Sequence, residues 1–115
     1  MTGDLAYLRH IRDAIGKIEI YASVGRELFM KESHWQDATM RQLEIIGEAT
    51  KHLSDDLRAE YIAVPWRQIA GLRDILIHNY MGVDLSAVWE VTQKDIPTLK
   101  AHVVAILTEL DKNEA

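Results

Sequence analysis

The sequence predicts an all-α protein, an antiparallel bundle of four main helices with short helices between them. Apolar residues recur at spacings of three and four along most of the chain, as the buried face of a helix requires. No segment shows a convincing strand pattern, and no internal repeat or linker interrupts the chain. Hydrophobic residues make up 48% of the sequence, with only 6 Gly and 2 Pro, which favours a folded chain over a disordered one.

The first two main helices are predicted from periodicity and from their starts. Asp4 is a candidate N-cap for the first helix, and Gly25 is expected to loosen or end it. Ser33-His-Trp-Gln36 has the spacing of a capping box, in which the two outer side chains satisfy free backbone donors of the second helix. The residues assigned to the inner faces are Leu8, Ile11, Ile15, Ile18 and Ala22, then Met40, Leu43, Ile46, Thr50 and Leu53.

A short third helix is predicted to start at Ser54-Asp55-Asp56, where acids suit the positive end of the helix dipole. It ends before Pro65, which suits the first turn of the next main helix. That helix is interrupted by Met81 to Asp84, and Leu85 to Gln93 form another short helix. Asp95-Ile-Pro97 opens the last main helix. The inner-face residues of these two main helices are Ile69, Leu72, Ile75 and Leu76, then Ile96, Leu99, Val103, Ile106 and Leu110.

Composition narrows the classes of function. A chain of 115 residues is long enough for one core, so residues 1–115 are expected to form a single domain. The absence of cysteine excludes disulfides, thiolate metal sites and a cysteine nucleophile. No metal or cofactor is expected, because the histidines show no ligand spacing. These histidines are His10, His34, His52, His78 and His102.

Charge and hydropathy bear on location and partners. The N-terminal apolar run contains charges and is not a signal peptide, and no stretch approaches the roughly 18 apolar residues of a membrane span. We therefore expect a cytoplasmic protein with no membrane contact. The net charge of −5 counts against a dedicated nucleic-acid binder, and no DNA binding is expected. Residues 81–115 hold three Lys/Arg against six Asp/Glu, so the middle of the chain is less acidic.

The stretch RDILIHNY, Arg73 to Tyr80, sets polar residues tightly among core positions. On one straight helix Arg73 and Tyr80 share a shoulder of the core face, whereas Asp74 and His78 lie on the far side. Arg73 and His78 are then about 140° apart and cannot form a compact pair. Either the helix ends or bends near His78, or a second copy of the chain brings its own pair alongside.

Two neighbouring residues favour a dimer. Gly71 lies on the His78 face and would let a partner helix approach closely, at a cost of roughly 1 kcal/mol in helix propensity. Ile77 would be exposed unless something covers it. Structural roles also fit: Arg73 in an ion pair, His78 as a cation near a helix C-terminus, and Tyr80 as a packing residue.

Two other segments are expected to have mainly structural roles. Gly47-Glu48-Ala49 is predicted to be a point of close helix packing, and a role for Glu48 or Lys51 near a site is the minor alternative. Trp66 and Trp89 are expected to be core aromatics.

Three stretches carry a family resemblance. PWRQIAGLRDILIHNYMGVDLSAVWEVTQKDIPTL closely resembles the HepT-like branch of the HEPN families, whose marker is Arg, four residues, His, any residue, Tyr. Arg73, His78 and Tyr80 match that marker. RQLEIIGEATKHLS resembles the second helix of the family, and YLRHIRDAIGKIEIY resembles the first. The resemblance thus covers nearly the whole chain.

The resemblance implies a HEPN-like all-α homodimer, in which the two Arg/His motifs meet and form a metal-independent ribonuclease site. Such a protein acts as the toxin of a type VII-like toxin–antitoxin pair. Its antitoxin is an MntA-like minimal nucleotidyltransferase that transfers AMP from ATP to the motif tyrosine, here Tyr80.

The implied chemistry assigns roles to the motif residues. His78 is the expected general acid or base, since an imidazole exchanges protons near neutral pH. Arg73 is the expected phosphate clamp. Asp74 is a candidate to orient His78 from one helical turn away, and Asn79 to contact RNA. The alternative is a non-catalytic HEPN dimer that binds a nucleotidyltransferase or a nucleotide; the acidity of the chain favours it, whereas the intact motif favours the enzyme.

Overall fold

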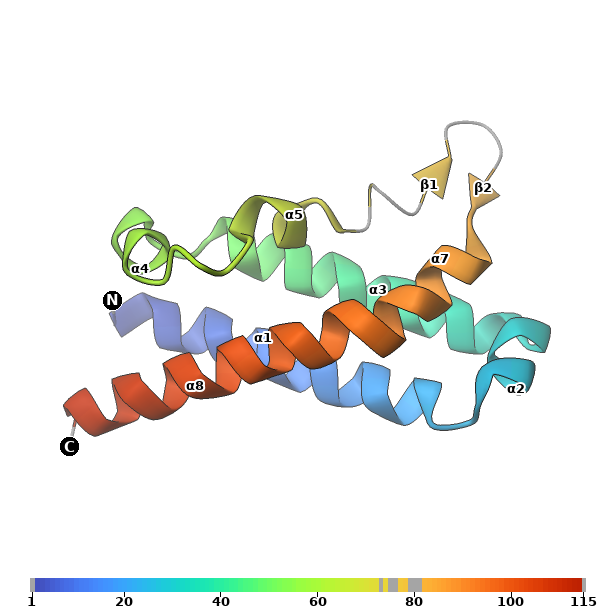
Figure 1. Ribbon diagram of the computed structural model, residues 1–115, viewed down its shortest axis with the longest axis horizontal. Helices are drawn as coiled ribbons and strands as arrows, with labels where there is room; N and C mark the ends of the chain where they lie inside the picture. Colours follow the sequence, from blue (N-terminus) through green and yellow to red (C-terminus); the bar gives the residue numbers. More distant parts are fainter. Residues whose placement is uncertain (1, 73, 75–76, 79–81, 115) are drawn as a thin grey trace.

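The computed structural model confirms the all-α class and describes residues 2–72, 74, 77–78 and 82–114 (Figure 1). The helices are α1 (Thr2–Ala22), α2 (Arg26–Lys31), α3 (Ser33–Lys51), α4 (Asp55–Glu60), α5 (Trp66–Ala70), α7 (Leu85–Glu90), the π-helix η1 (Val91–Asp95) and α8 (Ile96–Glu114). A strand pair, β1 (Ile77–His78) and β2 (Gly82–Val83), lies between α5 and α7.

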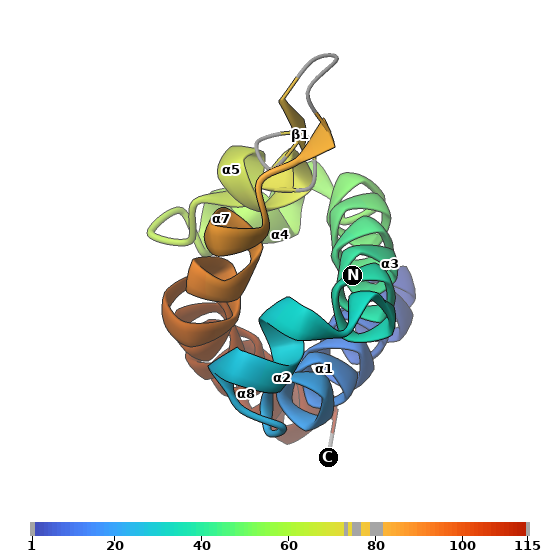
Figure 2. The same ribbon diagram turned by 90° about the vertical axis from the view of Figure 1, so that its right-hand side faces the viewer.

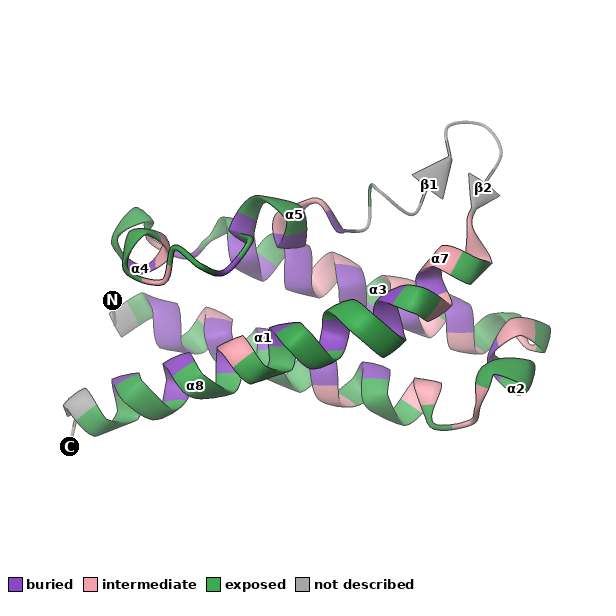
Figure 3. Cartoon of the chain, in the orientation of Figure 1, coloured by how far each residue is buried: buried purple, intermediate pink, exposed green. Residues whose placement is uncertain are grey.

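Three long helices form the body of the molecule. α1 packs against α3 and α8 and runs antiparallel to both, whereas α4, α5 and α7 complete the remaining side (Figures 1 and 2). The buried faces of these helices point inward (Figure 3). Among the described residues, no helix is both long enough and apolar enough to cross a membrane.

The core confirms most of the predicted inner faces, whereas Ile75 and Leu76 lie outside the described residues. The fully buried side chains among them are Leu8, Ile11, Ile15, Ile18, Leu43, Ile46, Thr50, Ile96, Val103 and Ile106. Trp66 is buried and donates its indole N–H to the carbonyl of Tyr61 at 3.1 Å. Trp89 is half-buried, with its ring 5.1 Å from that of Phe29. Both tryptophans therefore have the packing role that the sequence predicts.

The prediction that Asp4 caps the first helix is wrong. α1 begins before it, and the Asp4 side chain is buried at 3% exposure. Its carboxylate accepts hydrogen bonds from the backbone N–H and the hydroxyl of Ser54, at 2.8 and 2.7 Å. Ser54 in turn accepts from the N–H of Leu57 at 3.1 Å and is the N-cap of α4, as predicted. Asp4 thus joins the first turn of α1 to the start of α4.

The capping box at Ser33 and Gln36 is also wrong. Glu32 is the N-cap of α3, and no side chain caps that end. The Gln36 amide instead donates to the carbonyls of Phe29 and Met30, at 2.9 and 3.0 Å. Because only Glu32 separates α2 from α3, the last carbonyls of α2 need donors close by, and the buried Gln36 supplies them.

The last three helical segments follow one another without the predicted break at Asp95. Pro97 has no N–H and would leave a carbonyl unpaired in a regular α-helix. Here η1 precedes it, and the N–H of Ile96 donates to the carbonyl of Val91, five residues earlier. The π-turn therefore absorbs the proline within a continuous helical run. Asp84 caps the start of α7 by accepting from the N–H of Ala87 at 3.0 Å.

The main helix predicted to run from Pro65 past His78 is shorter than expected. α5 ends at Ala70 with Gly71 as its C-cap, and Leu72 and Asp74 are again helical. Ile77 and His78 form β1, which pairs antiparallel with β2 in the register Ile77 to Val83 and His78 to Gly82. Glycine weakens a helix, and β-branched Ile77 favours extended backbone. A two-residue strand is too short to show the alternation that predicts strands.

Candidate functional site

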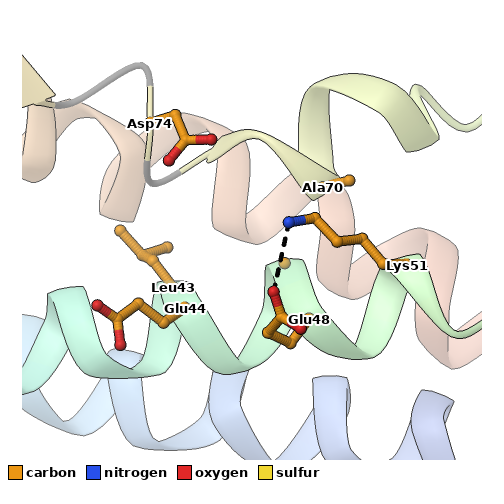
Figure 4. A pocket seen from close by; sticks show the side chains of 7 residues that line it. Leu43, Glu44, Glu48, Lys51, Ala70 and Asp74 are labelled. Atoms are coloured by element: carbon orange, nitrogen blue, oxygen red, sulfur yellow. Dashed lines mark hydrogen bonds and ion pairs between the residues drawn. The ribbon is translucent and has the colours of Figure 1, made fainter.

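A cleft lies between α3 and the chain that follows α5 (Figure 4). Its volume is about 210 Å³. Successive turns of α3 supply one wall, and Ala70 and Asp74 supply the other. The lining residues from α3 are Leu43, Glu44, Gly47, Glu48 and Lys51. The cleft is therefore next to the stretch RDILIHNY, which the sequence analysis singled out.

Gly47 brings the two walls together. A Cβ built on it would lie 2.9 Å from the carbonyl oxygen of Ala70, closer than real side chains approach. A side chain at this position would push α5 away from α3. The prediction that Gly47 is a point of close helix packing is confirmed, and this contact sets where the chain leaves α5 toward Asp74.

The described lining of the cleft is mostly acidic. Asp74 is exposed, and its carboxylate points into the cleft above Leu43 and Glu44 (Figure 4). Glu48 pairs with Lys51 at 3.3 Å, one turn along α3. The described lining residues thus include three carboxylates and one ammonium group, and Glu44 also pairs with Arg41, outside the lining, at 3.7 Å. A phosphate in this cleft needs a further cation, and Arg73, next to Asp74 in the sequence, is the nearest candidate along the chain.

The carboxylates do not form a metal centre in the described part of the chain. No group of three or more His, Asp or Glu side chains there is arranged to hold an ion.

The sequence predicts part of this cleft. Asp74 is a predicted site residue, and Glu48 and Lys51 are the minor alternative, whereas Leu43 and Glu44 were not predicted to line a site. A signal for Glu44 was present, since it lies four residues before Glu48 and so shares a helix face with it. That signal is weak, because most such pairs simply face solvent.

The structure describes only some of the predicted motif residues. Arg73, Asn79 and Tyr80 lie outside the described residues. Of His78, the backbone position is described, in β1 opposite Gly82. The helical geometry that put Asp74 one turn below His78 is therefore wrong, because His78 is in a strand. The supporting role of Asp74 stays a prediction.

The two residues assigned to a dimer face are in different elements. Ile77 is in β1, opposite Val83. Gly71 is the C-cap of α5, and a Cβ built on it would meet only the carbonyl oxygen of Arg67, at an ordinary 3.6 Å. Within the described part of one protomer, nothing therefore requires glycine at this position. The dimer face stays a prediction.

Comparison with known proteins gives a consistent set of relatives. The family described as Ribonuclease HepT-like matches residues 11–106. A protein of Caldanaerobacter subterraneus subsp. tengcongensis, named a putative RNase, is 43% identical over 102 residues, which cover 88% of this chain and 91% of that protein. A protein of Thermococcus cleftensis, named a probable ribonuclease HepT, is 42% identical over 95 residues, covering 82% of this chain and 86% of that protein.

A third relative is longer than this chain. It is a protein of Methanocaldococcus jannaschii, named a gamma-glutamylcyclotransferase and putative RNase, with 48% identity over 109 residues. The match covers 94% of this chain but only 49% of that protein, so this chain spans about half its length. No solved structure matches the chain.

Proposed function

Because the chain belongs to the HepT-like ribonuclease family, we propose that it is a metal-independent RNA endonuclease and the toxin of a toxin–antitoxin pair. The observation that carries the proposal is the Arg-x4-His-x-Tyr motif at Arg73, His78 and Tyr80, inside the matched residues 11–106. Relatives that align over most of this chain are named ribonucleases, which supports RNA as the substrate.

The proposed reaction uses a nucleophile that RNA itself carries. The 2′-oxygen attacks the adjacent phosphorus, and its proton passes to a basic group. The bond from phosphorus to the 5′-oxygen breaks, and that oxygen takes a proton as it leaves. The products are a 2′,3′-cyclic phosphate and a 5′-hydroxyl. No metal-activated water is needed, because the attacking oxygen belongs to the substrate.

Two side chains match the needs of this reaction. His78 is the proposed general acid or base, since an imidazole has an unperturbed pKa near 6.5 and exchanges protons at neutral pH. Arg73 is the proposed clamp, because a guanidinium stays charged and holds two phosphate oxygens while negative charge builds up on them. Asp74 and Asn79 are proposed supporting groups, Asp74 because its carboxylate already lines the cleft.

The active unit is proposed to be a homodimer. The strand pair that contains His78 projects from the helical body beside α7 (Figure 1). A projecting element is within reach of a second copy, which supports a site assembled from two motifs. Gly71 and Ile77 are the proposed contact residues on each protomer.

The proposed partner is an MntA-like nucleotidyltransferase that silences the toxin. The oxygen of Tyr80 attacks the α-phosphorus of ATP, a tyrosyl–AMP ester forms, and pyrophosphate leaves. The attached AMP adds bulk and negative charge at Tyr80, which is close to Arg73 along the chain. In this proposal the AMP phosphate competes with RNA phosphate for the Arg73 guanidinium.

Paired substitutions test the enzyme. Arg73→Ala and His78→Ala should each lower the rate of RNA cleavage by about 10²–10⁴-fold and relieve growth inhibition. His34→Ala is the matched control, since His34 is an exposed histidine on α3 outside the cleft. Circular dichroism should show that all variants keep their helical content.

The same variants distinguish the enzyme from the alternative function. A net charge of −5 and an acidic cleft lining favour a non-catalytic dimer that binds a nucleotidyltransferase or a nucleotide. If cleavage by wild type and by the His78→Ala variant is equal, the activity does not come from this motif and the enzyme proposal is wrong.

A further inference from the structure

A second, open groove follows the turn that joins α4 to α5. Its volume is about 750 Å³, larger than that of the cleft beside Asp74. Its lining includes two arginines, Arg58 and Arg67, together with the apolar side chains of Ile62 and Trp66. No aspartate or glutamate is among its described lining residues. In a chain of net charge −5, this groove is therefore a locally positive surface.

Arg67 supplies most of that positive character. It is exposed on the first turn of α5 and has no acidic partner within 4.0 Å among the described residues. Arg58, in contrast, donates to the carboxylate of Asp55 at 2.8 Å, so its charge is largely compensated. A guanidinium without a partner is ready to bind an anion, because no existing ion pair has to break first.

The groove and the candidate site share one described lining residue. Ala70 lines both the groove and the cleft that contains Asp74. A ligand bound at Arg67 therefore lies within one turn of α5 of a residue that lines the cleft. Ile62 also lines the groove and is 81% exposed, so its apolar side chain is accessible to a base.

We propose that this groove binds the phosphate backbone of single-stranded RNA as it approaches the cleft, with Arg67 as the principal phosphate contact. The inference rests on the proposed function and names a substrate-binding surface outside the Arg73–His78 motif. It also explains how an acidic chain holds a polyanion: the contact depends on one local cation, and the total charge of the protein matters less.

The test is direct binding of an RNA that the protein cannot cleave. A fluorescein-labelled single-stranded oligonucleotide with 2′-O-methyl groups lacks the attacking hydroxyl, so full-length protein can be titrated against it by fluorescence anisotropy. Arg67→Gln should weaken binding about ten-fold, the loss typical of one charge-assisted hydrogen bond. The slope of log affinity against log salt should fall by about 0.7. Arg67→Lys should retain part of the affinity.

Arg26→Gln is the matched control. Arg26 is also exposed, begins the short helix α2 at the opposite end of the molecule from α4, and has no acidic partner within 4.0 Å among the described residues (Figure 1). Its removal changes the net charge by the same amount, so its RNA affinity should stay within two-fold of wild type, about 0.4 kcal/mol.

The outcomes of these measurements test the RNA-binding groove and the ribonuclease activity separately. Equal RNA affinities for wild type, Arg67→Gln and Arg26→Gln would overturn the groove and leave the ribonuclease proposal standing. If RNA binding depends on Arg67 but the protein cleaves no RNA, the groove is an RNA-binding surface and the ribonuclease proposal is wrong. If Arg67→Gln binds RNA normally but loses affinity for a nucleotidyltransferase, the groove is a protein-binding surface and the inference is wrong. Wild type that binds no RNA contradicts both.

Discussion

The hydrogen bond between Asp4 and Ser54 joins two residues that are 50 positions apart in the chain. Asp4 is buried on the first turn of α1, and Ser54 is the N-cap of α4, so this bond holds the start of α4 against α1. Local spacing predicts the N-cap role of Ser54, whereas the burial of Asp4 depends on where α4 meets α1. Arg73, His78 and Tyr80, in contrast, form a motif with fixed spacing.

Tyr80 carries the most specific prediction at this scale. Co-expression with a cognate nucleotidyltransferase and ATP should attach AMP to Tyr80, and RNA cleavage should stop, because the adduct competes with RNA phosphate. Tyr80→Phe has no hydroxyl to accept AMP and should stay active in the presence of the partner. Peptide mass spectrometry locates the adduct. An adduct on another residue, or normal silencing of Tyr80→Phe, contradicts this switch.

Tyr61 gives a prediction about pH. Its hydroxyl oxygen is buried, and the carboxylate of Glu109 is the acceptor close to it. Burial, then the interaction of the hydroxyl with the Glu109 carboxylate and the negative charges of Glu109 and Glu60, raise the pKa of Tyr61 above its ordinary 10.0. In alkaline solution the folded chain therefore holds a proton that the unfolded chain has lost. This contribution to stability is complete below about pH 10 and is lost as the pH rises through the folded-state pKa.

Tyr61→Phe removes that loss. The variant should match wild type at neutral pH and unfold at a higher urea concentration than wild type above about pH 10. Urea titrations at pH 7 and at alkaline pH measure the difference, and Tyr21→Phe controls for loss of a tyrosine. Identical alkaline sensitivity of wild type and Tyr61→Phe would show that this hydroxyl is not the group responsible.

At the scale of helices and strands, periodicity predicted the long helices well and their ends poorly. Nearly every predicted inner-face residue of α1, α3 and α8 is buried, because an apolar period of 3.6 residues places these side chains on one face of the helix. Ends depend on neighbours. Gln36 bonds to α2 and not to its own helix, and Pro97 is absorbed by a π-turn. The helix expected around His78 gives way to a strand pair too short to leave a pattern.

A substitution at Gly47 tests the close contact between α3 and α5. Gly47→Ala places a methyl group 2.9 Å from the carbonyl oxygen of Ala70, so α5 must shift from α3. The free energy of unfolding should fall by about 1–3 kcal/mol, the usual cost of overpacking, and RNA cleavage should fall with it because the cleft changes shape. Urea unfolding and cleavage assays measure the two effects.

Gly16→Ala is the matched control for that change. Gly16 lies within α1, and a Cβ built on it meets nothing within 4 Å. The same substitution there should raise stability by roughly 0.5–1 kcal/mol, the helix propensity gained, with cleavage unchanged. Equal effects of the two substitutions would show that α3 and α5 are not in the close contact described.

At the scale of the whole molecule, the proposed site is expected to need two copies of the chain. The described cleft offers three carboxylates and one ammonium group, a poor environment for RNA phosphate on its own. Glu48 pairs with Lys51 and Glu44 with Arg41, so we propose that the cations for RNA phosphate come from the motif and from its second copy. Sequence spacing predicts that Arg73 and His78 do not pair on one straight helix, and the strand position of His78 agrees with a break in that helix.

Gly71 tests the dimer. A side chain at this position meets only ordinary contacts within the described protomer, so Gly71→Leu should fold with unchanged helical content. It should dissociate more readily than wild type, since the added bulk stands on the proposed partner face. Light scattering coupled to size-exclusion chromatography measures both masses. A wild-type protein that is monomeric at micromolar concentration contradicts the dimer.

Cleavage of a defined single-stranded RNA by purified wild type and His78→Ala in excess EDTA tests the proposed ribonuclease most directly. We expect that wild type cleaves and leaves 2′,3′-cyclic phosphate ends, that a 2′-deoxy nucleotide at the cleaved position blocks the reaction, and that His78→Ala is slower by about 10²–10⁴-fold. Cleavage that requires a divalent ion, proceeds at a 2′-deoxy position, or is unchanged in His78→Ala would contradict it.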